Sequence, residues 1–418
     1  VLSNRTLFKG IRVMPPGSVW TFDGRKIEKR LHCDAAALEN QPKLPETGYL
    51  EKLEEILLSV LPKYLAGEPK CMALTGGVDT RAIMAGANAR PGELPCITHG
   101  GMYGEMLDVR IARKVAEACG QKHITIPLGT SFLSSFPDLA GRTIYMTDGL
   151  ANVFEAHHLF LNRIIRDIAG IKITGKYGSQ VIKKISAFHR PTGYDADKDL
   201  ISPDLAKSLA AAKSAFEEHE AGNPLSQMIF KEIPWWWGGI ISIEFSQVAV
   251  RSPYLDNAFI DLLYRSPYVG IDAVQFQMGL VKKRRPDLYA IMTNAGFGGS
   301  GSPIARELRR RSYRTLGWIE KAYGRDKLPF ALHDPLALVD SRFISPLRLN
   351  RLFLGIADYR HYRIWTRDEL SGYIKEVLFD PRALSRPIWN KRYLEKAVKD
   401  HMAGRKNQLM EIQKVLSI

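Results

Sequence analysis

The order of apolar and polar positions predicts an α/β protein. Apolar residues recur at helical spacing over 48–66, and a short apolar run at 71–74 follows directly. Strand-like and helix-like segments then alternate, with strands expected at 94–98, 123–127 and 171–174 and helices at 81–89 and 108–119. Such alternation predicts a parallel sheet with helices on both faces, and ligands bind these sheets beyond the carboxyl ends of the strands.

The two ends of the chain have different patterns. Residues 18–22 and 26–31 alternate on either side of Asp23-Gly24, which predicts a β-hairpin. From residue 305 on, the pattern is mostly helical and basic. We therefore expect a linker and hairpin at 1–45, an α/β unit at 46–305 and a helical C-terminal lobe of the same unit at 306–418.

Composition narrows the class of protein. The 418 residues can form one large domain or two ordinary ones, and 45% hydrophobic with 25% charged residues is typical of a soluble globular chain. No apolar run approaches the ~18 residues of a membrane span, and no signal-peptide pattern is visible. The four cysteines are widely spaced, which favours free thiols in a reducing compartment. These features predict a cytoplasmic protein without a transmembrane segment.

A net charge of +15 raises the question of an anionic partner. Basic residues cluster at 282–285 and 306–311, and such clusters bind nucleic acid or anionic membranes in some proteins. Solvated helix faces explain both clusters equally simply, and we favour that interpretation. Nucleic acid is therefore not an expected partner.

The strongest chemical signal is the turn after the first strand. The apolar run ends at Leu74, and Thr75-Gly76-Gly77-Val78-Asp79-Thr80 leads into the next predicted helix. Two glycines allow a tight backbone that approaches a ligand closely, and the N-terminus of a helix attracts anions. The alternative is an ordinary strand-to-helix turn capped by Asp79. We predict a phosphate site in which Asp79 holds Mg²⁺.

The same six residues resemble the Ser-Gly-Gly-x-Asp-Ser loop of the ATP pyrophosphatases, with Thr at both Ser positions. Further segments are similar, in the same order, to the synthetase domain of asparagine synthetases. They are Phe8-x-Gly-Ile with Pro15-Pro-Gly, the segment 108–123, Arg251-Ser-Pro-Tyr-Leu-Asp256, and a final helix with His401-x-x-Gly-Arg. The family includes β-lactam synthetases, lasso-peptide cyclases and amidotransferases of sugar acids. Its glutaminase domain is not present in this sequence.

The resemblance implies the PP-loop fold of adenine-nucleotide α-hydrolases, with ATP and Mg²⁺ as cofactors. It implies an enzyme that adenylates a small-molecule or peptide carboxylate, releases pyrophosphate, and transfers an amine or ammonia. A separate glutaminase or another protein is then a possible partner. Carried over by position, the ATP-binding residues are Leu74, Thr75, Gly76, Gly77, Val78, Asp79, Thr80, Thr98, His99, Thr174 and Gly175.

The chain departs from this family at its second loop. The family's Ser-Gly-Glu-Gly-Ala-Asp-Glu is matched by Thr174-Gly-Lys-Tyr-Gly-Ser-Gln180, which has no acid, and a family lysine aligns with Asn294. Either Lys176 replaces the lost cation as a catalytic residue, or the chain is a degenerate subunit for nucleotide binding or complex assembly. A tRNA-modifying ATP pyrophosphatase is a third hypothesis, which suits the charge but not 251–256.

One further group carries metal-binding side chains. His157 and His158 follow Glu155 within a predicted helical stretch at 152–165. Because adjacent helical residues point in different directions, a shared metal ion is not expected there.

Overall fold

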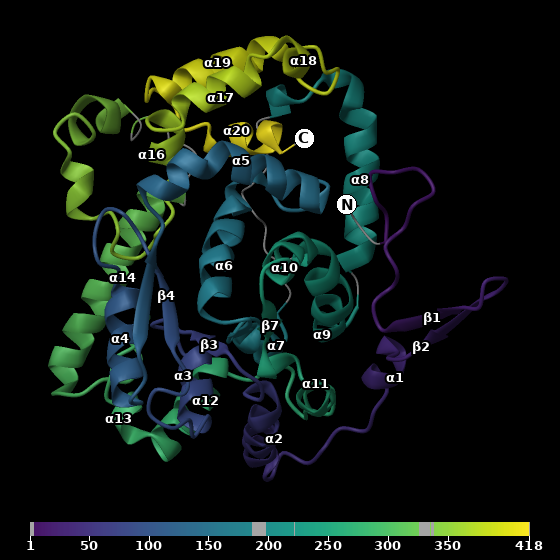
Figure 1. Cartoon of the computed structure of the whole chain (residues 1–418), viewed down its shortest axis with the longest axis vertical. Coiled ribbons are helices and arrows are strands. Elements are labelled where there is room, and N and C mark those ends of the chain that lie inside the picture. The colour runs from purple at the N-terminus through teal and green to yellow at the C-terminus, as the bar shows by residue number, and fades with distance from the viewer. Residues whose placement is uncertain (1–3, 186–197, 221, 326–334, 336–337, 418) are drawn as a thin grey trace.

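The computed structural model describes residues 4–185, 198–220, 222–325, 335 and 338–417. A sheet of five parallel strands lies at its centre, in the order β5-β4-β3-β6-β7 (Figure 1). The strands are β3 (Lys70–Ala73), β4 (Cys96–Gly100), β5 (His123–Pro127), β6 (Ile171–Ile173) and β7 (Ala249–Arg251). The predicted α/β architecture is confirmed, and β7 is a strand that the sequence pattern did not predict.

The strand order creates a switch point between β3 and β6. From β3 the chain moves outward through β4 to β5, and it then returns to place β6 and β7 on the other side of β3. The loops that follow β3 and β6 begin side by side at this point, and open α/β sheets bind ligands at such switch points. The turn at Gly76-Gly77 and the loop at Thr174-Gly175 both begin there.

Successive strand residues point to opposite sides of the sheet, so both faces carry apolar side chains. Helices cover both faces and bury these side chains. Met72 and Ile173 pack on one face into a core formed with α2 (Tyr49–Tyr64), α3 (Asp79–Gly86), α4 (Leu107–Ala118), α7 (Gly178–Lys183), α11 (Asn257–Tyr264), α12 (Ala273–Arg284) and α13 (Pro286–Tyr289). Cys71 and Ile97 pack on the other face with α5 (Thr130–Thr147), η1 (Val153–Glu155), α6 (Ala156–Ile168), α10 (Gly238–Phe245), α16 (Tyr362–Arg367), α17 (Ser371–Leu378), α19 (Lys391–Met402) and α20 (Leu409–Leu416). The C-terminal helices thus share a core with α5 and α6 (Figure 1).

The predicted hairpin is also present. Strands β1 (Ser18–Phe22) and β2 (Ile27–Leu31) pair antiparallel and extend to one side of the sheet (Figure 1). The remaining elements are α1 (Ala35–Glu39), η3 (Lys198–Leu200), η4 (Pro203–Leu205), α8 (Ala206–Glu220), α9 (Pro224–Ser226), the π-helix η5 (Gln227–Trp236), η6 (Pro253–Leu255), α14 (Pro303–Arg325), η8 (Asp340–Ile344), η9 (Leu349–Leu352) and α18 (Pro381–Leu384). Within the described part of the chain, no helix combines the length and the apolar character that a bilayer crossing requires.

Candidate functional site

The turn after β3 has the predicted strand-turn-helix form, and α3 begins at Asp79. The backbone N–H of Thr75 donates to Thr80 Oγ1 at 3.3 Å, and the N–H of Gly77 donates to Thr75 Oγ1 at 3.3 Å. Both threonine hydroxyls therefore accept hydrogen bonds from backbone N–H groups of the turn. Thr75 is exposed, so this end of the turn is open to a ligand.

The second loop packs directly on the start of α3. A Cβ added at Gly175 would lie 2.7 Å from Asp79 Cβ and 2.8 Å from the backbone nitrogen of Thr80, so only glycine allows this approach. The Ser179 hydroxyl and the Gln277 side-chain amide each donate to Asp79 Oδ1 at 2.7 Å. Burial raises the pKa of Asp79, although these two hydrogen bonds act in the opposite direction. The two loops are thus joined through the predicted metal ligand.

Two residues outside the predicted site hold the other side of the turn. The backbone N–H of Gly76 donates to Asp108 Oδ1 at 3.2 Å, and Asn294 Nδ2 donates to the same oxygen at 2.7 Å. The backbone N–H of Asn294 also donates to Gly76 O at 3.0 Å. Burial raises the pKa of Asp108. In the sequence, these two residues could be found only through the family resemblance. Asp108 opens a segment that matches the family, and Asn294 aligns with a family lysine.

A cavity of about 710 Å³ opens beside these residues, between the start of α4 and α14. Asp108 and Asn294 form part of its wall, and α14 contributes Arg311, Arg314 and Lys321. The charge of Lys321 acts to lower the pKa of Asp108 against the larger effect of burial. The C-terminal segment therefore brings positive charge to the cavity beside Asp108 and Asn294, although its sequence contains no motif for this chemistry.

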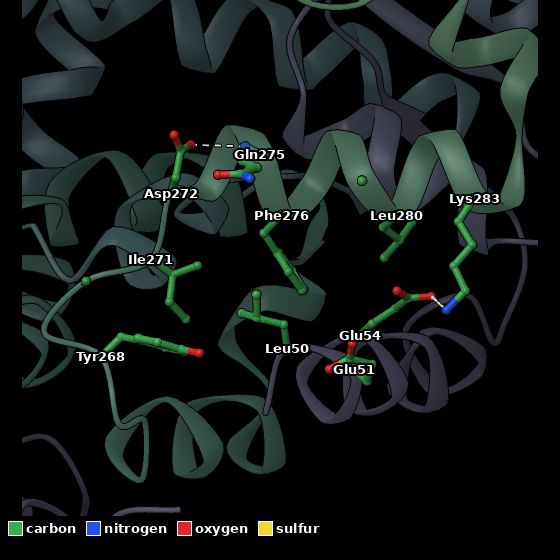
Figure 2. Close-up of a pocket in the computed structure, with 12 residues that line it drawn as sticks. Leu50, Glu51, Glu54, Tyr268, Ile271, Asp272, Gln275, Phe276, Leu280 and Lys283 are labelled. Atoms are coloured by element: carbon green, nitrogen blue, oxygen red, sulfur yellow. Dashed lines mark hydrogen bonds and ion pairs between the residues drawn. The ribbon is translucent and has the colours of Figure 1, made fainter. Parts of the chain in front are cut away.

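A second hollow, of about 570 Å³, lies between α2 and α12 (Figure 2). Leu50, Phe276 and Leu280 point into it, and Glu54 pairs with Lys283 across it at 3.1 Å. Its lining includes no residue of the turn or of the second loop. Lys283 of the first basic cluster is therefore engaged at this hollow.

Lys176, the predicted catalytic cation, forms an ion pair with Glu244 of α10. Its Nζ lies 2.7 Å from Glu244 Oε2, and the lysine side chain is 31% exposed. Glu244 Oε1 also lies 3.0 Å from Nζ of the buried Lys172. The catalytic role of Lys176 stays a prediction.

The predicted adenine contacts have other partners in the structure. The Thr98 hydroxyl donates to Leu74 O at 2.7 Å and lies 2.9 Å from His123 Nε2. His99 packs edge-on against Tyr359, with 5.5 Å between the ring centroids. Burial, together with the nearby charges of Lys172 and His158, lowers the pKa of His99 to about 3, so its imidazole is neutral. Adenine contact at Thr98 and His99 stays a prediction.

The remaining predicted ATP-binding residues lie in the interior rather than at the surface of the protein. The side chains of Leu74, Val78, Thr80 and Thr174 are buried. Leu74 also bonds through its backbone to Ile97 O at 2.9 Å. The predicted residues that meet around the turn are therefore Thr75, Gly76, Gly77, Asp79, Thr80 and Gly175, with Ser179 added by the structure.

Neither a scan against protein-family models nor a search of curated proteins finds a match for this chain.

Proposed function

We propose that the chain binds ATP·Mg²⁺ at Thr75–Thr80 and acts as an ATP-dependent, AMP-forming amide ligase of the asparagine synthetase type. One observation carries the proposal: the Gly76-Gly77 turn lies at the switch point of a parallel sheet, next to a cavity lined by three cations. Sheets of this topology bind ligands at that point, and the first turn of the following helix attracts anions.

The residues around the turn suit a metal-bound triphosphate. The exposed hydroxyl of Thr75 is a donor at the open end of the turn, and Lys321 and Arg314 supply positive charge from the facing helix. The carboxylates of Asp79 and Asp108 flank the turn on opposite sides and are the oxygen ligands that Mg²⁺ prefers. When bound, ATP supplies the AMP group that activates a carboxylate.

In this proposal the cations that face the bound phosphates are those of α14, and Lys176 stays paired with Glu244. Electrostatic stabilisation of phosphate charge is the main task of such cations. The nitrogen source is ammonia, an amine substrate or a separate glutaminase. The PP-loop fold and the family relationship are parts of the same proposal.

A degenerate nucleotide-binding subunit is the second candidate, and a specific observation favours it. Glu244 neutralises Lys176, and the neutral Asn294 occupies the position at Gly76 where the resemblance implies a lysine. A chain with this arrangement can retain nucleotide without transferring AMP.

ATP–pyrophosphate exchange separates the two candidates. The purified chain is incubated with ATP, Mg²⁺ and labelled pyrophosphate, with and without a panel of amino-acid and peptide carboxylates. Carboxylate-dependent exchange supports the ligase, and a Lys321→Ala variant should then exchange more slowly. Nucleotide binding without exchange supports the degenerate subunit, and absence of both exchange and nucleotide binding contradicts both candidates.

A further inference from the structure

Three metal-binding side chains meet where η1 joins α6. One ligand atom each of Glu155, His157 and His158 lies within 4.8 Å of the others. Nε2 of His158 is 3.4 Å from Glu155 Oε2, and Nε2 of His157 is 4.0 Å from the same oxygen. The expectation that adjacent histidines diverge is wrong here. Helical side chains lean toward the N-terminus, so both rings reach back over Glu155, with 4.3 Å between their centroids.

His157 has the form that a metal ligand requires. Its Nδ1 lies 2.7 Å from Phe154 O, and because a carbonyl oxygen only accepts, Nδ1 carries the hydrogen. Nε2 is therefore unprotonated, and this buried nitrogen has no hydrogen-bond partner within the described residues. Burial, with the charge of His158, lowers the pKa of His157 well below its ordinary value. The lone pair on Nε2 is thus available and directed toward Glu155.

A carboxylate lies beside His158 on the side away from Glu155. Its Nδ1 lies 3.2 Å from Glu244 Oε1, and Lys172 and Lys176 hold that carboxylate in place. Metal-binding histidines commonly carry such an outer partner, a carboxylate or a backbone carbonyl, on the second ring nitrogen. His157 has such a partner in Phe154 O, whereas His158 Nδ1 lies beside Glu244 without forming a hydrogen bond, and the Nε2 atoms of both rings lie within 4.0 Å of Glu155 Oε2.

Glu155 can serve as the anionic ligand. Burial acts to raise its pKa, but the contact with His158 and the positive charge of Arg360 outweigh burial and hold the pKa below its ordinary value. The carboxylate is therefore ionised at neutral pH. Its side chain is 20% exposed, which gives an ion access from solvent.

We propose that Glu155, His157 and His158 form a binding site for a divalent transition-metal ion of the Zn²⁺ class, with water at the open position. Two imidazoles and one carboxylate match the ligand set of open zinc sites and disfavour Mg²⁺ and Ca²⁺. Bonds of about 2.0–2.1 Å in tetrahedral geometry separate ligands by roughly 3.3 Å. The observed 3.4 and 4.0 Å between Glu155 and the two histidines require closures of less than about 1 Å, and the limit of 4.8 Å among the three ligand atoms allows at most about 1.5 Å for the remaining pair. This proposal does not depend on ATP binding at the turn.

Metal titration tests the site on the intact chain. Protein stripped with a chelator is titrated with Zn²⁺ against a chromophoric competitor, and Co²⁺ is then used as a spectroscopic probe. We expect one tightly bound equivalent of Zn²⁺, a tetrahedral Co²⁺ spectrum, and a metal-dependent rise in Tm. A wild-type chain that takes up no stoichiometric Zn²⁺ overturns the proposal.

Conservative variants assign the ligands. Glu155→Gln and His158→Gln should each weaken Zn²⁺ binding by at least ~100-fold, since even outer partners of metal ligands contribute about 10–100-fold. His123→Gln is the matched control, because His123 lies on β5 and bonds to Thr98. His157 is left intact because its ring is fully buried. Variants whose circular dichroism matches wild type but which bind Zn²⁺ equally well contradict the assignment.

Discussion

Replacing Glu244 by Gln should destabilise the protein strongly, because this one carboxylate neutralises two lysines. Glu244 and Lys172 are 3% and 4% exposed, and their charged atoms are 3.0 Å apart. At an effective dielectric constant of about 20, charges at 3.0 Å attract by about 5.5 kcal/mol, and breaking a buried pair costs about 3–5 kcal/mol net. We expect Glu244→Gln to lower the free energy of unfolding by an amount in that range, with little added by the more exposed Lys176.

Urea unfolding of the wild-type chain, of Glu244→Gln and of the double variant Lys172→Met/Glu244→Gln measures this cost. In Lys172→Met/Glu244→Gln the buried lysine is also removed, so the double variant should be more stable than Glu244→Gln alone. Lys176 and Lys172 hold the pKa of Glu244 well below 4.5 despite burial. The stabilisation is therefore present above about pH 4.5 and is lost as the pH falls through the folded-state pKa. A loss under about 1 kcal/mol, or a double variant no more stable than the single one, refutes this reasoning.

Two further substitutions test the turn itself. Gly175→Ala should cost about 1–3 kcal/mol in urea unfolding, because its Cβ would lie 2.7 Å from Asp79 Cβ, whereas Gly141→Ala on α5, with no atom within 4 Å, should be neutral or stabilising. Equal effects of the two substitutions contradict the close packing. Asp108→Asn keeps the acceptor for the Gly76 N–H and removes a carboxylate whose pKa burial raises above 3.8. Ionisation of Asp108 therefore penalises the folded state once the pH rises above 3.8, so the stability of the variant relative to wild type should increase as the pH is raised from that value, and a stability difference independent of pH contradicts this reasoning.

Much of the fold followed from local pattern. The central strands β3 to β6 are short apolar runs between helices of clear periodicity, and their predicted bounds agree with the structure within two residues. The Asp23-Gly24 turn identified the hairpin in the same way. By contrast, β7 has only three residues and ends at Arg251, so its pairing with β6 depends on tertiary context rather than on its own pattern.

The candidate site was predictable in position but not in its side-chain contacts. Parallel strands placed the turn and the loop at Thr174-Gly175 on one edge, and the structure brings them together. The partner of Lys176 is 68 residues away in the chain, and Asp108 is 32 residues from Gly76. No local pattern encodes contacts over such separations. From the sequence alone, the basic residues of α14 were interpreted as a solvated helix face. Only the fold shows which cavity they line.

Calorimetric titration with ATP, with and without Mg²⁺, tests the central claim most directly. Asp79→Asn preserves an acceptor for Ser179 and removes one charge from the turn, and Asp138→Asn on the exposed face of α5 is the control. We predict that wild type and Asp138→Asn bind ATP more tightly when Mg²⁺ is present, and that Asp79→Asn loses this Mg²⁺ dependence while remaining folded. Unchanged Mg²⁺-dependent affinity in Asp79→Asn, or no ATP binding by the wild-type chain, would contradict the account.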